Sequence, residues 1–245
     1  MRRARLWRYL LWQARDFVVE RGAPLLIVAF LMWGPVIVTL RRMSGAMPDS
    51  TLVRANAVSV IVEGFATFSV IAVLVGINGV VSNDRVRGYY RFLFAKPVSI
   101  PRYYAQAYAV NGIGLMVTAA IVLAAIYALG HSVFLVKALW MVALVYVSLG
   151  GLGFLFSTLL RFDWILMGAT LGLAHVLRFL FPSGGSRGGQ VLNVILPPFH
   201  QLSDVGTQLA RGETADSSML LWLVGWGVSA FLLGLLILRR RPLAS

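Results

Sequence analysis

Long apolar blocks alternate with short polar segments along the whole chain. Six blocks are long enough to form membrane-crossing helices, at residues 23–40, 57–81, 105–129, 138–160, 164–181 and 219–238. A hydrocarbon core roughly 30 Å thick requires about 20 apolar residues of helix. The pattern therefore predicts an all-α integral membrane protein with six transmembrane helices, forming a single domain over residues 1–245.

The first 22 residues combine apolar and basic positions at helical spacing. Leu10 and Phe17 share one side with Trp7, whereas Arg8 and Arg15 lie elsewhere. This arrangement is typical of a helix that lies in the membrane interface. We expect an N-terminal interfacial amphipathic helix over residues 1–22, ended by Gly22-Ala23-Pro24. The alternative is a disordered basic tail before the first span.

The longest connection on the other side of the membrane comprises residues 182–218. It opens with PSGGSRGG, continues into the apolar QVLNVIL, and reaches Pro197-Pro198. After the prolines, Phe199, Leu202 and Val205 follow helical spacing. We expect short outer-face helices before the last span, broken by the proline pair and dipping into the membrane. An ordinary surface loop is the alternative.

The distribution of basic residues predicts the orientation. The chain is 59% hydrophobic and only 13% charged, yet its net charge is +13. Six crossings place both termini on one side, and that side holds 15 of the 22 basic residues. Basic residues accumulate on the cytoplasmic side. We therefore expect a multi-pass protein of the cell (plasma or inner) membrane with both termini cytoplasmic, in contact with membrane lipids, and no nucleic-acid partner.

No motif in the sequence indicates catalysis. The chain has no cysteine, no phosphate-binding G-x-x-x-x-G-K-[ST] and no G-x-S-x-G nucleophile motif. Its three histidines lie far apart and lack the spacing of metal ligands. We therefore expect neither an enzyme nor a metal or cofactor site in this chain.

Two features inside the apolar blocks are candidate functional positions. Glu63 is an acid within the second span, where a charge is costly, so we expect it to line a pathway or to make a structural hydrogen bond. Gly168 and Gly172 form a G-x-x-x-G pair in the fifth span. Such pairs let two helices approach closely, which makes this face a possible dimer interface, although the motif also arises by chance.

The cytoplasmic segment 82–104 is the most informative connection. Residues 84–94 place apolar Tyr90 and Phe94 at helical spacing, with arginines elsewhere, and Pro97 and Pro101 follow. We expect an amphipathic helix held between two spans, which would move both of them when a partner grips it. A passive interfacial connection is the alternative.

This segment resembles the loop after the second span of ABC-2 type permeases, the membrane subunits of one class of ABC exporter. The matching residues are Asp84-Arg85-Val86-Arg87-Gly88, an apolar run and Pro97-Val98-Ser99. The basic residue that follows in the family's pattern appears here at Arg102, displaced by Ile100-Pro101. The segment Leu196-Pro197-Pro198-Phe199-His200-Gln201-Leu202 is similar to the family's segment before the last span. With the six-span layout, the resemblance extends over essentially the whole chain.

The resemblance implies a complex in which two permease subunits, as a homodimer or heterodimer, are gripped by two cytoplasmic ABC ATPase subunits. ATP and Mg²⁺ would be bound by those partners, and this chain would provide the transmembrane pathway for export. The helix at 84–95 would couple ATP hydrolysis to transport through Asp84, Gly88, Tyr90, Phe94 and Pro97. The alternative is a non-transport polytopic membrane protein, either a lipid-modifying enzyme or a membrane scaffold subunit.

Overall fold

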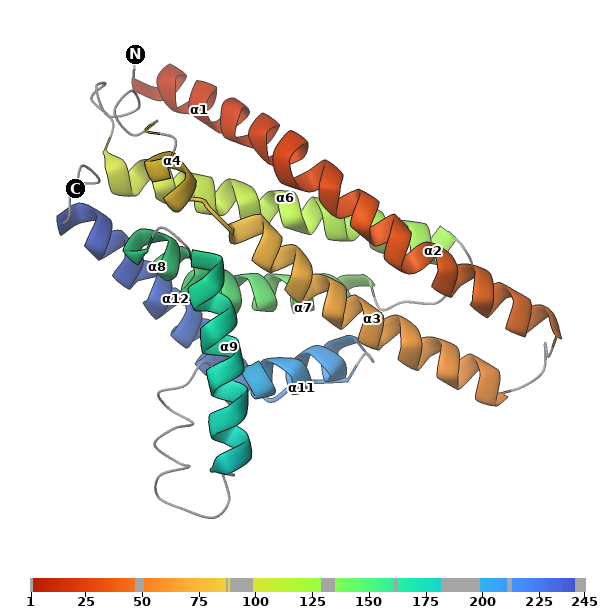
Figure 1. Ribbon diagram of the computed structural model, residues 1–245. Coiled ribbons are helices and arrows are strands. Elements are labelled where there is room, and N and C mark those ends of the chain that lie inside the picture. The colour runs from red at the N-terminus through yellow and green to blue at the C-terminus, as the bar shows by residue number, and fades with distance from the viewer. Residues whose placement is uncertain are drawn as a thin grey trace.

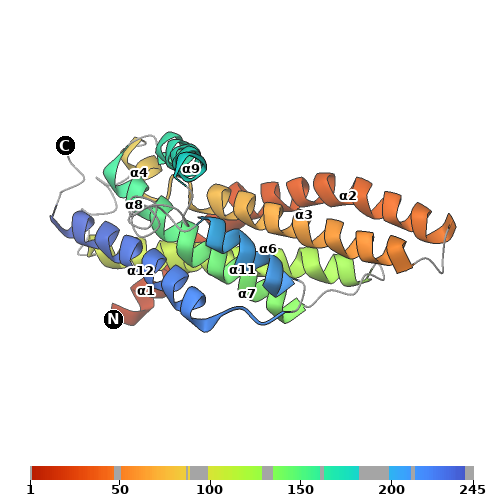
Figure 2. The ribbon, with the colours of Figure 1, turned by 90° about the horizontal axis from the view of Figure 1, so that it is seen from below.

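In the computed structural model, residues 2–46, 51–86, 88, 99–128, 135–160, 163–181, 199–210 and 213–240 are described, and the elements they form are all helical. Five helical segments are long and apolar enough to cross a membrane: Tyr9–Pro35, Glu63–Asp84, Ile100–Ala128, Leu135–Leu159 and Ser217–Arg240. They run along a common direction in one bundle (Figures 1 and 2). The chain is therefore a multi-pass membrane protein.

The N-terminal helix continues into the first span. Helix α1 (Arg2–Phe17) passes through a π-helical turn, η1 (Val18–Gly22), into α2 (Ala23–Ala46). This corrects the helix end expected at Gly22-Ala23-Pro24. The wide turn, in which the Ala23 N–H donates to the Val18 carbonyl, keeps the ladder intact at the point where a proline would otherwise clash with the preceding turn. Figure 1 shows α1 and α2 as one long, gently bent rod beside α6.

The remaining helices follow the predicted apolar blocks closely. Their bounds are α3 Thr51–Ile77, α4 Ser82–Val86, α6 Ile100–Ala128, α7 Leu135–Val145, η2 Tyr146–Gly150, α8 Gly151–Leu159, α9 Asp163–Leu180, α11 Phe199–Ala210 and α12 Ser217–Arg240. The turn η2 is π-helical and joins α7 to α8 without interruption. Four of the predicted spans thus correspond to α3, α6, α7–α8 and α12, and the first corresponds to α2.

Helix α12 lies parallel to α7–α8. Near their first residues, the Lys137 Nζ donates to the Glu213 carbonyl at 3.2 Å, and further along the Ser148 Oγ donates to the Leu223 carbonyl at 3.3 Å. Both helices therefore run toward the end of the bundle where α1 begins and α12 ends, which we call the basic end. Residues 160–216 must return the chain to the opposite end before α12 starts.

The predicted fifth span, residues 164–181, is helical but is oriented differently from the others. Figure 1 shows α9 running across the direction of the bundle, and Figure 2 shows it almost end-on. Helix α9 is not among the five helical segments that are long and apolar enough to cross a membrane. Within α9, residues Ile165–Ala174 form a shorter apolar stretch. That α9 itself crosses the membrane stays a prediction.

Of the two short helices expected around the proline pair, the second is present as α11; that it lies at the outer face of the membrane stays a prediction. Leu202 and Val205, on the predicted apolar side, are buried. Gly206 lies beside Met141 of α7, so α11 packs on the half of the bundle away from the basic end. The expected partner helix before Pro197 lies outside the described residues.

Small residues bring α8 and α12 into direct backbone contact. A Cβ placed on Gly151 would lie against the Gly227 carbonyl, and one placed on Gly227 would lie against the backbone of Val147 and Ser148. Close helix approach through glycine is a common way of associating helices in lipid, where the hydrophobic effect does not drive helices together. This contact fixes the last span to the middle of the fourth.

Candidate functional site

Helix α3 ends in a short non-helical segment, Asn78–Val81, before α4 begins; we call this segment the α3 break. Gly79 adopts a φ of +72°, a left-handed conformation that residues with a Cβ rarely adopt. Asn-Gly is a common turn dipeptide. Non-helical backbone inside an apolar span requires partners for its polar groups from the rest of the protein.

Arg21 supplies the partners on the carbonyl side of the α3 break. Its guanidinium donates to the Gly76 carbonyl at 2.7 Å, to the Asn78 carbonyl at 3.1 Å, and to the Asn111 Oδ1 at 2.6 Å. The carbonyls at a helix C-terminus carry partial negative charge, so a cation is favoured there. The side chain thus links the N-terminal run, α3 and α6.

Asp163 and Ser157 supply the partners on the amide side. The Asp163 Oδ2 accepts hydrogen bonds from the Gly79 N–H at 2.9 Å and from the Ser82 Oγ at 3.2 Å. The Ser157 Oγ accepts from the N–H groups of Val81 and Ser82, each at 3.0 Å. Both acceptors are buried and flank the α8–α9 connection. The α3 break is therefore held from both sides.

Both π-helical turns face the same part of α6. The turn η1 contains Arg21, which reaches Asn111, while η2 begins with Tyr146, whose ring lies against Gly112. The Tyr146 and Tyr108 hydroxyls each donate to the other residue's carbonyl, and the two rings lie 4.7 Å apart. π-Helical turns often mark functional positions, because the extra residue changes the direction of a side chain.

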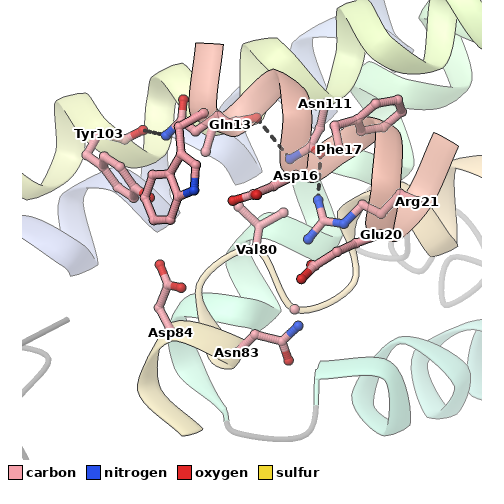
Figure 3. A pocket seen from close by; sticks show the side chains of 13 residues that line it. Gln13, Asp16, Phe17, Glu20, Arg21, Val80, Asn83, Asp84, Tyr103 and Asn111 are labelled. Carbon is pink, nitrogen blue, oxygen red and sulfur yellow. Dashed lines mark hydrogen bonds between the residues drawn. The ribbon is translucent and has the colours of Figure 1, made fainter. Parts of the chain in front are cut away.

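A polar cavity of about 330 Å³ opens beside the α3 break, between α1, α4 and α6. Its described lining consists of Trp12, Gln13, Asp16, Phe17, Glu20, Arg21, Gly79, Val80, Asn83, Asp84, Tyr103, Ala107 and Asn111. Figure 3 shows the carboxylates of Asp16, Glu20 and Asp84 turned toward the same space. The Arg21 guanidinium instead points to Asn111. Ionisable side chains inside a span usually mark a functional site.

The segment expected to contact the ATPase begins differently from the prediction. Helix α4 ends at Val86, and Gly88 has a φ of +70°, a conformation through which a helix does not continue. An uninterrupted helix from Asp84 to Phe94 is therefore wrong. The Asp84 carboxylate accepts a hydrogen bond from the Tyr104 hydroxyl at 3.1 Å, which ties the start of this segment to the start of α6. Tyr90, Phe94 and Pro97 lie outside the described residues.

The other predicted positions lie away from the cavity. The Glu63 side chain is exposed on α3 and is not part of the cavity's described lining. Gly168 and Gly172 are exposed on α9, and a Cβ at either would meet no atom within 4 Å. No helix of the described chain covers this face, so its use by a second subunit stays a prediction, as does a pathway role for Glu63.

The α3 break and the cavity beside it are suited to binding a ligand and to mechanical coupling between helices more than to catalysis. Among the described residues, no group of three or more histidines and acids is placed to hold a metal ion. Most hydrogen bonds at the α3 break join side chains to backbone groups; the two between side chains run from Arg21 to the Asn111 Oδ1 and from Ser82 to the Asp163 Oδ2. What this geometry can do is hold a ligand in the cavity or move several helices together.

Sequence reasoning missed the residues at the centre of this arrangement. In the sequence, Arg21 is one of many arginines in the N-terminal segment, and Asp163 lies in a short connection between two spans. Neither position indicates by itself that the side chain bonds to a buried group. The hydrogen-bonded partners are 55 and 84 residues apart in the chain. The one local signal was the Asn78-Gly79 dipeptide, which indicates a turn before the expected end of the second span.

Comparison with protein-family models, with curated proteins and with solved structures found no match to this chain.

Proposed function

We propose that the chain is the permease subunit of an ABC exporter, driven by ATP hydrolysis in a separate cytoplasmic subunit. The sequence supports this through its ABC-2 type segments at 84–102 and 196–202. The basic end, which carries Arg102 and Arg239 at helix ends, is the cytoplasmic side in this proposal. The proposal includes the sixth crossing predicted at residues 164–181, which would return the chain to the end of the bundle where α12 starts.

The observation that carries the proposal is how the start of the cytoplasmic segment is attached. Asp84 is bonded to Tyr104 at the start of α6, and Ser82 is bonded to Asp163 at the start of α9. The α3 break just before them is bonded to Arg21 of the N-terminal run. A partner that pushes on residues 84–97 would act directly on α6 through Asp84, and on α9 and the N-terminal run through the neighbouring Ser82 and the α3 break, as the proposed coupling requires.

The test uses the permease purified from its native membrane with any associated ATPase. Phe94→Ala removes an aromatic anchor, which in a docking groove is worth about 2 kcal/mol or more, so at least a tenfold loss of ATPase binding is expected. Gly88→Trp instead adds a bulky side chain to the same segment, which would block close approach of the ATPase. Because Gly88 has a positive φ, Gly88→Ala is the matched control for backbone strain.

The expected result is that Phe94→Ala and Gly88→Trp each release the ATPase, while Gly88→Ala retains it and retains ATP hydrolysis by the complex. If both bulky and truncated variants keep the ATPase and its activity, the segment is a passive connection. If no ATPase accompanies the unmodified chain, the non-transport alternative is favoured.

A further inference from the structure

Two cavities of different character flank α6. Ala107 and Asn111 line the polar cavity. Two residues after Ala107 on the same helix, Ala109 lines a groove of about 440 Å³ between α6 and α7, whose described lining is apolar except for Tyr146. The two cavities lie at the same height on one helix, so their position along the bundle does not explain the difference. The apolar groove suits lipid chains, whereas the polar cavity requires another occupant.

The opening of the polar cavity is polar too. Glu20 and Asn83 line the cavity and are exposed, which places them at its opening. The hydrogen bond from Arg21 to the Asn78 carbonyl is exposed as well. All four residues belong to helical segments that are long and apolar enough to cross a membrane. Exposed polar and ionised groups at membrane depth usually face water, because contact with lipid is costly whatever other contacts they make. Water is therefore the expected medium at this opening.

The deeper wall has an acceptor that water would complete. Gln13 lines the cavity with only 9% of its surface exposed. Its Nε2 donates to the Tyr103 carbonyl at 3.5 Å, but no described group donates to its Oε1. Buried acceptors without a donor are rare because they cost free energy, and bound water often completes them. The cavity volume of about 330 Å³ leaves room for several water molecules, each of which occupies roughly 30 Å³ in the liquid.

The α3 break lines the same cavity through Gly79 and Val80. Non-helical backbone at membrane depth is found where protein or a water-filled cavity surrounds it. Asp163 and Ser157 provide protein partners on one side of the break, and the polar cavity lies on another. Water in the cavity would therefore complete the surroundings that this backbone requires.

The cavity extends inward from the basic end. Figure 3 shows Tyr103 and Asp84 at one end of it, and Arg21 and Asn111 at the other. Tyr103 lies in the first turn of α6, which starts at the basic end (Figure 1), and Asn111 lies about two turns further along. Water that enters from the basic end thus reaches Arg21 and the α3 break.

We propose that the polar cavity between α1, α4 and α6 is a water-filled vestibule that opens toward the basic end. It admits water and small hydrophilic solutes as far as the α3 break. As the entrance of an export pathway the vestibule rests on the proposed function, but its hydration requires no ATPase.

The experiment measures how fast single introduced cysteines react, which is direct because the chain has no cysteine of its own. The probe is 2-(trimethylammonium)ethyl methanethiosulfonate, a small, permanently charged reagent that does not enter lipid. Ala107→Cys places a thiol in the vestibule, and Val80→Cys places one on the wall formed by the α3 break. Ala109→Cys, in the apolar groove of the same helix, is the matched control. Rates are measured on the full chain in phosphatidylcholine nanodiscs.

We expect Ala107→Cys and Val80→Cys to react at least tenfold faster than Ala109→Cys. The reactive form is the thiolate, which forms in water and is disfavoured in apolar surroundings. Because Ala107 is buried and Ala109 is exposed, exposure alone predicts the opposite order. Equal rates, or faster reaction at position 109, would overturn the vestibule. If one vestibule variant does not fold, the other decides.

The direction of the opening is tested in sealed membrane vesicles of the expression host, prepared right-side-out and inside-out. Ser99→Cys at the start of α6 and Ser217→Cys at the start of α12 are exposed references for the two membrane faces. Ala107→Cys should react in the preparation in which Ser99→Cys reacts. Reaction only in the preparation in which Ser217→Cys reacts contradicts an opening toward the basic end. A chain that reacts at position 107 but binds no ATPase keeps the vestibule and loses the proposed export role.

Discussion

The hydrogen bonds of Arg21 provide the most direct test of how the α3 break is held. Replacing Arg21 with leucine keeps an apolar stem but removes three donors from Gly76, Asn78 and Asn111. The bond to the Asn78 carbonyl is exposed, so water replaces it at little cost. The other two are partly buried, and each is worth about 1.5 kcal/mol or more because the donor is charged. We therefore expect a loss of about 3 kcal/mol of unfolding free energy.

The measurement is unfolding in mixed micelles with increasing SDS, followed by circular dichroism. Arg15→Leu, on an exposed position of the same helical run, is the matched control and should change stability by less than about 0.5 kcal/mol. Arg21→Lys should recover only part of the loss, because an ammonium cannot reproduce the fork of the guanidinium. Hydrogen exchange of peptides across 76–83 should accelerate in Arg21→Leu alone.

The reasoning is refuted if the leucine variants at positions 21 and 15 unfold at the same SDS concentration. It is also refuted if exchange at the α3 break stays unchanged, because the loss would then arise elsewhere. A double-mutant cycle with Asn111→Ala separates the direct bond from general disruption of the site. We expect a coupling of about 1 kcal/mol or more between the two positions.

Three further predictions follow from packing, topology and an exposed face. Gly227→Ala should cost about 3 kcal/mol of stability, because the new Cβ meets the backbone of α7–α8, whereas Gly225→Ala meets nothing within 4 Å and should be neutral or stabilising. Cysteines at the exposed positions Ser99 and Ser217 should react with impermeant reagents from opposite membrane faces; labelling of both from one face contradicts the topology. Gly172→Leu should reduce dimer formation measured by cross-linking if two α9 helices meet there, and an unchanged dimer removes this face from consideration.

The apolar helices could be predicted from the sequence because they depend on local composition. A run such as 105–129 contains few charged residues, and in lipid its backbone N–H and C=O groups must hydrogen-bond to one another. Helix α6 therefore follows from the sequence alone. The helical spacing of Leu202 and Val205 likewise indicated a helix, which is present as α11, whereas the burial of these two side chains inside the protein was not predicted.

The α3 break could not be predicted, because it depends on partners far away in the chain. The apolar run Val80-Val81 reads as the end of a span, and the turn there is stabilised by distant partners, namely Arg21 at its carbonyl groups and Asp163 and Ser157 at its N–H groups. Likewise, Gly22-Ala23-Pro24 carries the usual signals of a helix end, yet a π-helical turn carries the helix through. Contacts with α6 on the same side outweigh the local preference.

The polar cavity and the α3 break share residues, so a change at one of them should reach the other. Arg21 lines the cavity and holds the break, while Asp84 lines the cavity and begins the segment proposed to contact the ATPase. A push on that segment that displaces Asp84 should therefore also disturb the hydrogen bonds of Arg21 at the α3 break. The measurement is hydrogen exchange of peptides across 76–83, compared between the chain alone and its complex with an ATPase. Changed exchange would show that the segment and the break move together, whereas unchanged exchange would show that they act independently.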